Sequence, residues 1–137
     1  ASARVPRGAA LARARAARMA GGVRVTPPRQ VSLQDARRGL AMFRQMGIPV
    51  LGVAENMSSF IPPDLPDRRY ALFGSGGGAT LAADYDVPLL AQIPMEMPVQ
   101  EGGDSGRPIV INRPDSASAS AFRELADGVL QAVAQPA

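Results

Sequence analysis

The stretch IPVLGVAEN, residues 48–56, decides the fold class of this chain. It is an almost unbroken run of apolar residues, and it follows a helical pattern that ends at Gly47. A strand with one buried face would alternate apolar and polar residues, so an unbroken run predicts a strand buried on both faces, as in a parallel sheet. The similar run VPLLAQIP, residues 87–94, predicts a neighbouring strand of the same kind.

Helical patterns lie before, between and after these two predicted strands in the sequence. Upstream, Ser32 followed by Asp35 predicts a helix that begins with a capping box and ends at Gly47. Its predicted buried stripe is Leu33, Ala36, Leu40, Phe43 and Met46. Residues 77–85 predict a short helix between the two strands, and residues 97–108 predict a helical turn and loop.

A short strand is predicted at residues 21–26, and a long helix near the C-terminus. The long helix is expected to begin with Asp115 and Ser116 as caps. Its predicted buried stripe is Phe122, Leu125, Ala126, Val129, Leu130 and Val133. The intervening IVIN, residues 109–112, predicts either an edge strand or an extended approach to this helix.

Strands that alternate with helices in this way predict an α/β fold, a partial doubly wound parallel sheet with flanking helices. Residues 22–137 are predicted to form a single α/β domain. Residues 1–21 are an Arg- and Ala-rich flank, either disordered or helical near residues 9–19. Residues 1–34 hold seven Arg and no acid, while the rest is net negative. A transit peptide, an arm for nucleic acid or a membrane surface, and a flank without such a role remain alternatives.

Composition excludes several kinds of chemistry. The chain has no Cys, which excludes disulfides, thiolate metal sites and Cys nucleophiles, and no His, the commonest general base. All 15 basic residues are Arg, and a phosphate loop of the form GxxxxGK[ST] needs Lys. No apolar run approaches the roughly 20 residues of a membrane-spanning helix. We therefore predict no catalytic residue, no metal ligand and no membrane association.

The carboxyl ends of the two buried strands are the candidate site, because ligands of open α/β sheets bind there. Glu55 and Asn56 end the first strand. The Asn56 amide suits the edge of an adenine, although it could simply satisfy loop backbone. The proline that ends the second strand, Pro94, shapes a loop whose backbone could line the same crevice.

Three further motifs favour ordinary structural roles. The glycines of GSGGG, residues 74–78, could cradle an anion, but linkage and helix capping explain them better because 17 residues separate Asn56 from Gly74. Glu96, Glu101 and Asp104 could bind Mg²⁺, but solvated charge is the better interpretation. The RRY triplet at residues 68–70 has too few aromatic neighbours for nucleic-acid binding, which is not expected.

Taken together and in order, several segments resemble the C-terminal half of the Mrp/ApbC family of MinD-like P-loop ATPases. The resemblance covers roughly residues 19–126. Its specific parts are VSLQDARRGL (31–40), GIPVLGVAENMS (47–58), FGSGGG (73–78), VPLLAQIP (87–94), GDSGRPIV (103–110) and FRELA (122–126). It implies ATP binding and hydrolysis, a homodimer, a cytoplasmic location, and delivery of iron–sulfur clusters to apoproteins.

The resemblance transfers few functional residues to this chain. It implies that Asn56 lies on the adenine side of a nucleotide site and that Pro94 and Met95 form the neighbouring wall. Members often carry Cys-x-x-Cys where this chain has Pro62 and Leu65, so an iron–sulfur cluster is not expected here. The family's phosphate loop has no counterpart either. We therefore expect little or no ATP binding and no activity from this chain alone. The alternative hypothesis is a non-catalytic interaction or dimerisation module with a basic N-terminal arm.

Overall fold

The computed structural model describes residues 19–135 of the chain. The predicted helix near residues 9–19 lies outside this range except for its last residue. The described elements, in chain order, are β1 (Gly22–Thr26), the 3₁₀-helix η1 (Gln30–Ser32), α2 (Leu33–Gln45), β2 (Val50–Phe60), α3 (Gly77–Asp84), β3 (Leu89–Met95), α4 (Met97–Ser105), α5 (Ile109–Asn112) and α6 (Ala117–Ala134).

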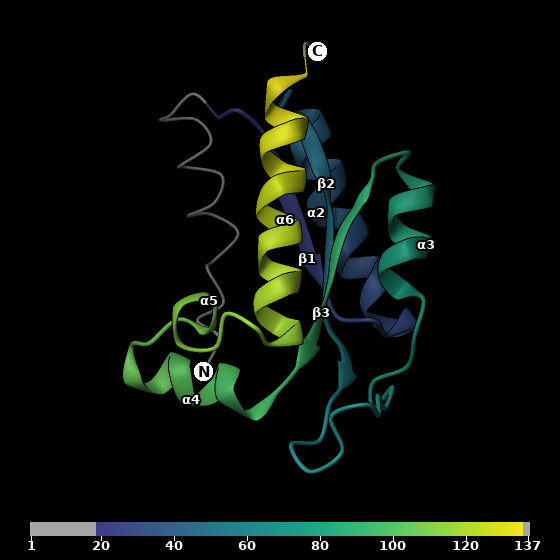
Figure 1. Cartoon of the computed structure of the whole chain (residues 1–137). Coiled ribbons are helices and arrows are strands. Elements are labelled where there is room, and N and C mark those ends of the chain that lie inside the picture. The colour runs from purple at the N-terminus through teal and green to yellow at the C-terminus, as the bar shows by residue number, and fades with distance from the viewer. Residues whose placement is uncertain (1–18, 136–137) are drawn as a thin grey trace.

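The three strands form a parallel sheet with the order β1-β2-β3. Helices α2 and α3 cover one face of the sheet, and α6 crosses the other face, mainly over β3 (Figure 1). Right-handed crossovers that progress in one direction place their helices on the same face, which is why α2 and α3 lie together. The prediction of a parallel sheet with flanking helices is confirmed.

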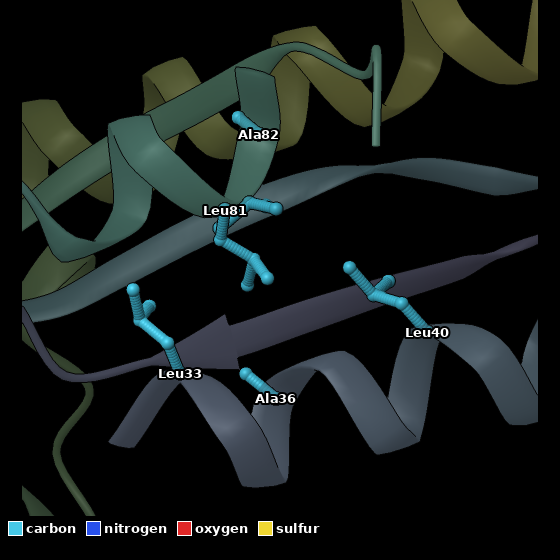
Figure 2. Close-up of a cluster of buried hydrophobic side chains, with 6 residues drawn as sticks. Leu33, Ala36, Leu40, Leu81 and Ala82 are labelled. Atoms are coloured by element: carbon cyan, nitrogen blue, oxygen red, sulfur yellow. The ribbon is translucent and has the colours of Figure 1, made fainter. Parts of the chain in front are cut away.

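The core between the sheet and helices α2 and α3 explains the helical stripe seen in the sequence (Figure 2). Leu40 and Leu81 are completely buried and meet the buried Val53 of β2. Leu33, Ala36 and Ala82 complete the cluster, with Phe43 packed against it. Four apolar positions at helical spacing, Leu33, Ala36, Leu40 and Phe43, thus place one face of α2 against the sheet, whereas Met46 is the half-buried C-cap residue.

The start of α2 differs from the predicted capping box. Ser32 is the N-cap residue, but its side chain makes no capping hydrogen bond. Its φ and ψ of −84° and −9° are helical because η1 leads directly into α2, whereas a capping side chain needs an extended backbone at this position. By contrast, Ser116 has an extended backbone and caps α6, its Oγ accepting a hydrogen bond from the Ala119 N–H at 3.1 Å.

Two further predictions are wrong in part. The IVIN stretch forms the short helix α5 instead of an edge strand, because a turn of hydrogen bonds to Pro108 and Ile109 satisfies its backbone locally. The buried stripe of α6 is also shifted towards its start. Ser118, Ala119 and Ala121 are buried, whereas Ala126, Leu130 and Val133 are exposed. Among the described elements α6 packs mainly against β3, so part of its predicted stripe stays exposed.

Arg24 is half-buried on β1, which is an edge strand among residues 19–135. Its guanidinium lies over Gly39 of α2 and forms an ion pair with Asp35 at 3.5 Å. An interior strand with both faces covered would leave this charge without access to water. Among residues 19–135, no helix has the length and apolar character needed to cross a membrane.

Candidate nucleotide-side site

The structure brings the three predicted site residues to the same edge of the sheet. Asn56 of β2 pairs with Ile93 of β3, so Pro94 and Met95 follow directly beside it. The register shifts between Asn56 and Phe60, and Met57 has a left-handed φ of 54°. A non-glycine residue in this conformation is uncommon and marks a sharp local turn of the backbone. β2 therefore bends at the point where the Asn56 side chain is presented.

The Asn56 side chain is exposed and held in one orientation. Its Oδ1 accepts a hydrogen bond from the Met57 N–H at 2.9 Å. Within residues 19–135 its amide nitrogen has no hydrogen-bond partner. An amide oxygen accepts up to two hydrogen bonds, and an amide nitrogen donates two. Asn56 thus retains both donors and one acceptor position for an external group.

Pro94 and Met95 form a rigid wall beside Asn56. Pro94 is buried, and its carbonyl accepts a hydrogen bond from the Ser118 Oγ at 3.3 Å. The carbonyl of the half-buried Met95 accepts one from the Ile61 N–H at 3.0 Å. The wall is therefore attached to the start of α6 on one side and to the end of β2 on the other.

Glu55, next to Asn56, is a buried carboxylate with a structural role. It is 1% exposed, and its Oε2 accepts a hydrogen bond from the Gly78 N–H at 2.7 Å. Gln92 of β3 lies 3.5 Å from its other oxygen. A carboxylate is favourable at the N-terminus of a helix, where unpaired N–H groups point outward. Glu55 thus joins β2, β3 and the start of α3.

The role of Glu55 was missed in the sequence, although the residue was noted as the end of its strand. The detectable sign was a carboxylate within an apolar run, which needs a buried partner. The partner, Gly78, lies 23 positions away and could not be assigned from spacing.

The glycine-rich stretch forms the N-terminal end of α3. Gly76 is the N-cap residue, with a left-handed φ of 82°. The Gly77 N–H donates to the Pro28 carbonyl at 3.0 Å, and the Gly78 N–H donates to Glu55. Both amides are engaged within the chain, so neither is available to a phosphate. This supports the interpretation of the glycines as a helix entry.

The proline-rich loop closes on itself directly beyond the site. Phe60 and Tyr70 form an isolated antiparallel bridge with backbone hydrogen bonds of 2.7 and 2.9 Å. Between them the Leu65 N–H donates to the Pro62 carbonyl at 3.2 Å. Pro62 is buried and Leu65 is exposed. Neither side chain can coordinate iron.

The acidic residues after β3 are dispersed. The Glu96 Oε1 accepts a hydrogen bond from the Ser118 N–H at 2.7 Å, so this carboxylate anchors the start of α6. Asp104 is hydrogen-bonded to Gln100, and Glu101 is exposed. In the described part of the chain no group of three or more potential ligand side chains could hold a metal ion.

Comparison with known proteins shows the family of this chain. The model of the NUBPL iron-transfer P-loop NTPase family matches residues 8–130, which is most of the chain. The chain belongs to this family. It is 57% identical over 119 residues to an iron–sulfur cluster carrier protein of Synechocystis, covering 87% of this chain and 34% of that protein.

Solved structures place the NUBPL-family chain in the same fold group. The nucleotide-binding protein of Archaeoglobus fulgidus in complex with ADP matches with a TM-score of 0.59 and 27% identity, covering 74% of this chain and 40% of that one. The septum site-determining protein MinD of Pyrococcus horikoshii, complexed with Mg-ADP, matches with a TM-score of 0.60 and 27% identity, covering 78% and 40%. The chain spans about a third of the length of the curated relatives it matches.

The residues present fit one part of a bound ATP and do not fit a cluster. Asn56 has free hydrogen-bond groups that suit a base, and the half-buried Met95 lies beside it, whereas Pro94 is buried. The phosphates have no such partner, because the chain has no Lys and the amides of Gly77 and Gly78 donate hydrogen bonds within the chain. The chain has no Cys for an iron–sulfur cluster.

Proposed function

We propose that this chain forms the base-binding side of the nucleotide site of an ATP-dependent iron–sulfur cluster carrier. The observation that carries the proposal is the position of Asn56, whose partly unpaired amide is exposed beside the Pro94–Met95 wall. An adenine presents an N–H donor next to a ring-nitrogen acceptor, and a carboxamide can bind both groups at once. The similarity to the iron–sulfur cluster carrier protein of Synechocystis supports the carrier role, and the similarity to the ADP complex of the Archaeoglobus protein supports the nucleotide class.

The same proposal predicts no ATP hydrolysis by this chain alone. Phosphate contacts and the bound metal ion supply most of the catalysis in P-loop enzymes. Here no Lys exists to contact the phosphates, and the glycine-rich stretch is engaged with Pro28 and Glu55. Iron–sulfur apoproteins are the proposed recipients for the carrier as a whole, with the cluster as its cargo. The Pro62 loop of this chain offers that cargo no ligand.

Adenosine is expected to bind weakly, and ATP·Mg²⁺ no more tightly, because the added phosphates find no partner. In a titration of the ¹⁵N-labelled chain followed by NMR, we expect shifts at the amides of Asn56, Met57 and Met95. Asn56→Ala should remove these shifts, whereas Asn112→Ala, an exposed Asn on α5, should leave them unchanged. Shifts confined to other regions would contradict the base-binding assignment. Micromolar ATP affinity with turnover would contradict the predicted inactivity.

A second function, a dimerisation module, is favoured by one surface feature. Four large apolar side chains are exposed on the loop between β2 and α3, namely Leu65 (45%), Tyr70 (40%), Leu72 (61%) and Phe73 (37%). Exposed apolar side chains gathered on one segment are typical of protein interfaces. This loop adjoins the Asn56 edge through the Phe60–Tyr70 bridge, so a partner here would lie close to the nucleotide side.

If the loop is a dimer interface, the purified chain is expected to be a dimer in light scattering. Replacing Leu72 and Phe73 together by Glu should give a monomer, because burying two carboxylates in an apolar contact is unfavourable. Ile111→Glu is the control, since Ile111 is 77% exposed on α5 and lies outside the loop. A monomeric wild-type chain at all accessible concentrations would exclude this module.

A further inference from the structure

A groove lies between β3 and α6, away from the Asn56 edge. Its volume is about 790 Å³. Pro88, Leu89 and Leu90 form one side, at the amino end of β3. At Gly128 α6 packs so closely on Leu90 that an added Cβ would lie 3.0 Å from this side chain. The two proposed functions above do not use this groove.

The strand beside the groove has an unpaired edge. Within the described residues β3 pairs with β2 alone, and its other edge faces no strand. Such an edge presents a row of N–H and C=O groups that can pair with an added strand. Addition of an extended peptide to a sheet edge is a common mode of peptide recognition.

The helix side of the groove is a polar row. Ser120, Glu124, Asp127 and Gln131 recur at spacings of four, three and four, which places them on one face of α6, and Gln135 follows the end of this helix. At 1.5 Å per residue the helical part of this row is about 16 Å long. An extended segment of roughly five residues, at 3.3 Å each, has the same length. The row is thus long enough to contact an extended peptide along one side.

The charge of the groove selects the kind of peptide. Glu124 and Asp127 are exposed and have no hydrogen-bond or ion-pair partner among residues 19–135. Arg123 is the one basic residue of the lining, so the groove carries a net negative charge. A peptide with basic side chains therefore complements it, and acidic peptides are repelled.

We propose that this groove binds an extended, basic segment of another protein, which adds as a strand to the free edge of β3. Backbone hydrogen bonds to β3 would hold the segment, and Glu124 and Asp127 would bind its Arg or Lys side chains. The proposal does not depend on nucleotide binding, because the groove lies at the amino end of β3 and the Asn56 site lies at its carboxyl end.

The test uses the full chain and a fluorescent synthetic peptide, as long as β3, that alternates valine with arginine. We expect saturable binding in fluorescence anisotropy that weakens as salt is raised, because exposed charge pairs are screened. Joint replacement of Glu124 and Asp127 by Lys should weaken binding about tenfold or more, since attraction becomes repulsion. Gln131→Trp should block the groove, and Glu101→Lys, an exposed charge change on α4, is the control.

Several results would overturn the proposal. Equal binding of a valine–glutamate peptide would show that the charge of the groove does not select its ligand. Unchanged binding by the Lys double variant and by Gln131→Trp would place the peptide elsewhere. If the same variants instead convert a dimer of the chain to a monomer in light scattering, the occupant is a second copy. If adenosine still shifts the Asn56 amide signal in these variants, the nucleotide proposal holds even though the peptide proposal has failed.

Discussion

Replacing Gly77 by Ala is expected to lower the free energy of unfolding by about 3 kcal/mol, at the upper end of the usual range for overpacking. The added Cβ would lie 2.5 Å from the carbonyl oxygen of Pro28 and 2.8 Å from its carbonyl carbon. These are backbone atoms that no rotamer change can remove. Relief requires α3 to move away from the end of β1, which also breaks the hydrogen bond from the Gly77 N–H to Pro28.

Urea unfolding followed by circular dichroism measures this loss. The matched control is Gly103→Ala on α4, where nothing lies within 4 Å of the added Cβ and φ is not positive. Because Ala has the higher helix propensity, this control should be neutral or stabilising by up to about 1 kcal/mol. Equal effects of the two substitutions would show that the contact of Gly77 with Pro28 is not formed.

Replacing Glu55 by Ala is expected to destabilise the chain by about 3 kcal/mol, because it leaves the buried Gly78 N–H unpaired and creates a cavity. Glu55→Gln should cost less, since the amide oxygen still accepts from Gly78 but carries no charge. Hydrogen exchange should show faster exchange at the Gly78 amide in the Ala variant. This links the effect to the 2.7 Å hydrogen bond seen in the structure.

The control for Glu55 is Glu101→Ala, an exposed carboxylate for which a change within about 0.5 kcal/mol is expected. A stabilised Glu55→Ala variant would contradict the prediction. It would mean that the free-energy cost of removing a 99% buried carboxylate from water exceeds the stabilisation from its hydrogen bonds.

The fold class could be predicted because the relevant patterns are local. Residues 50–56 of the apolar run lie in β2, which continues to Phe60 into the predicted loop, and the run at residues 87–94 corresponds to β3 within two residues at either end. Leu33, Ala36 and Leu40 of α2 are buried where the helical period places them. The predictions failed where the burial of a side chain depends on its tertiary neighbours. Leu130 is apolar and in phase with the buried positions of α6, yet it is 68% exposed.

The site could be predicted only in part. Asn56, Pro94 and Met95 could be placed at one sheet edge, since parallel strands end on the same side. Their contacts could not be predicted. The hydrogen bond from the Met57 N–H to Asn56 depends on a left-handed residue after the strand, and the bond from Ser118 to Pro94 joins residues 24 positions apart.

By itself, the sequence determined which chemistry this chain lacks and which family it resembles. A chain without Cys, His or Lys has no thiolate, imidazole or phosphate-loop lysine in any conformation. Only the tertiary structure decided what the glycine-rich stretch and Glu55 do. Hydrogen bonds satisfy whichever polar groups the packed fold brings within reach, and the fold brought Pro28 and Glu55 to the amides of Gly77 and Gly78. A stretch that resembled a phosphate cradle in the sequence therefore has both of these amides engaged within the chain.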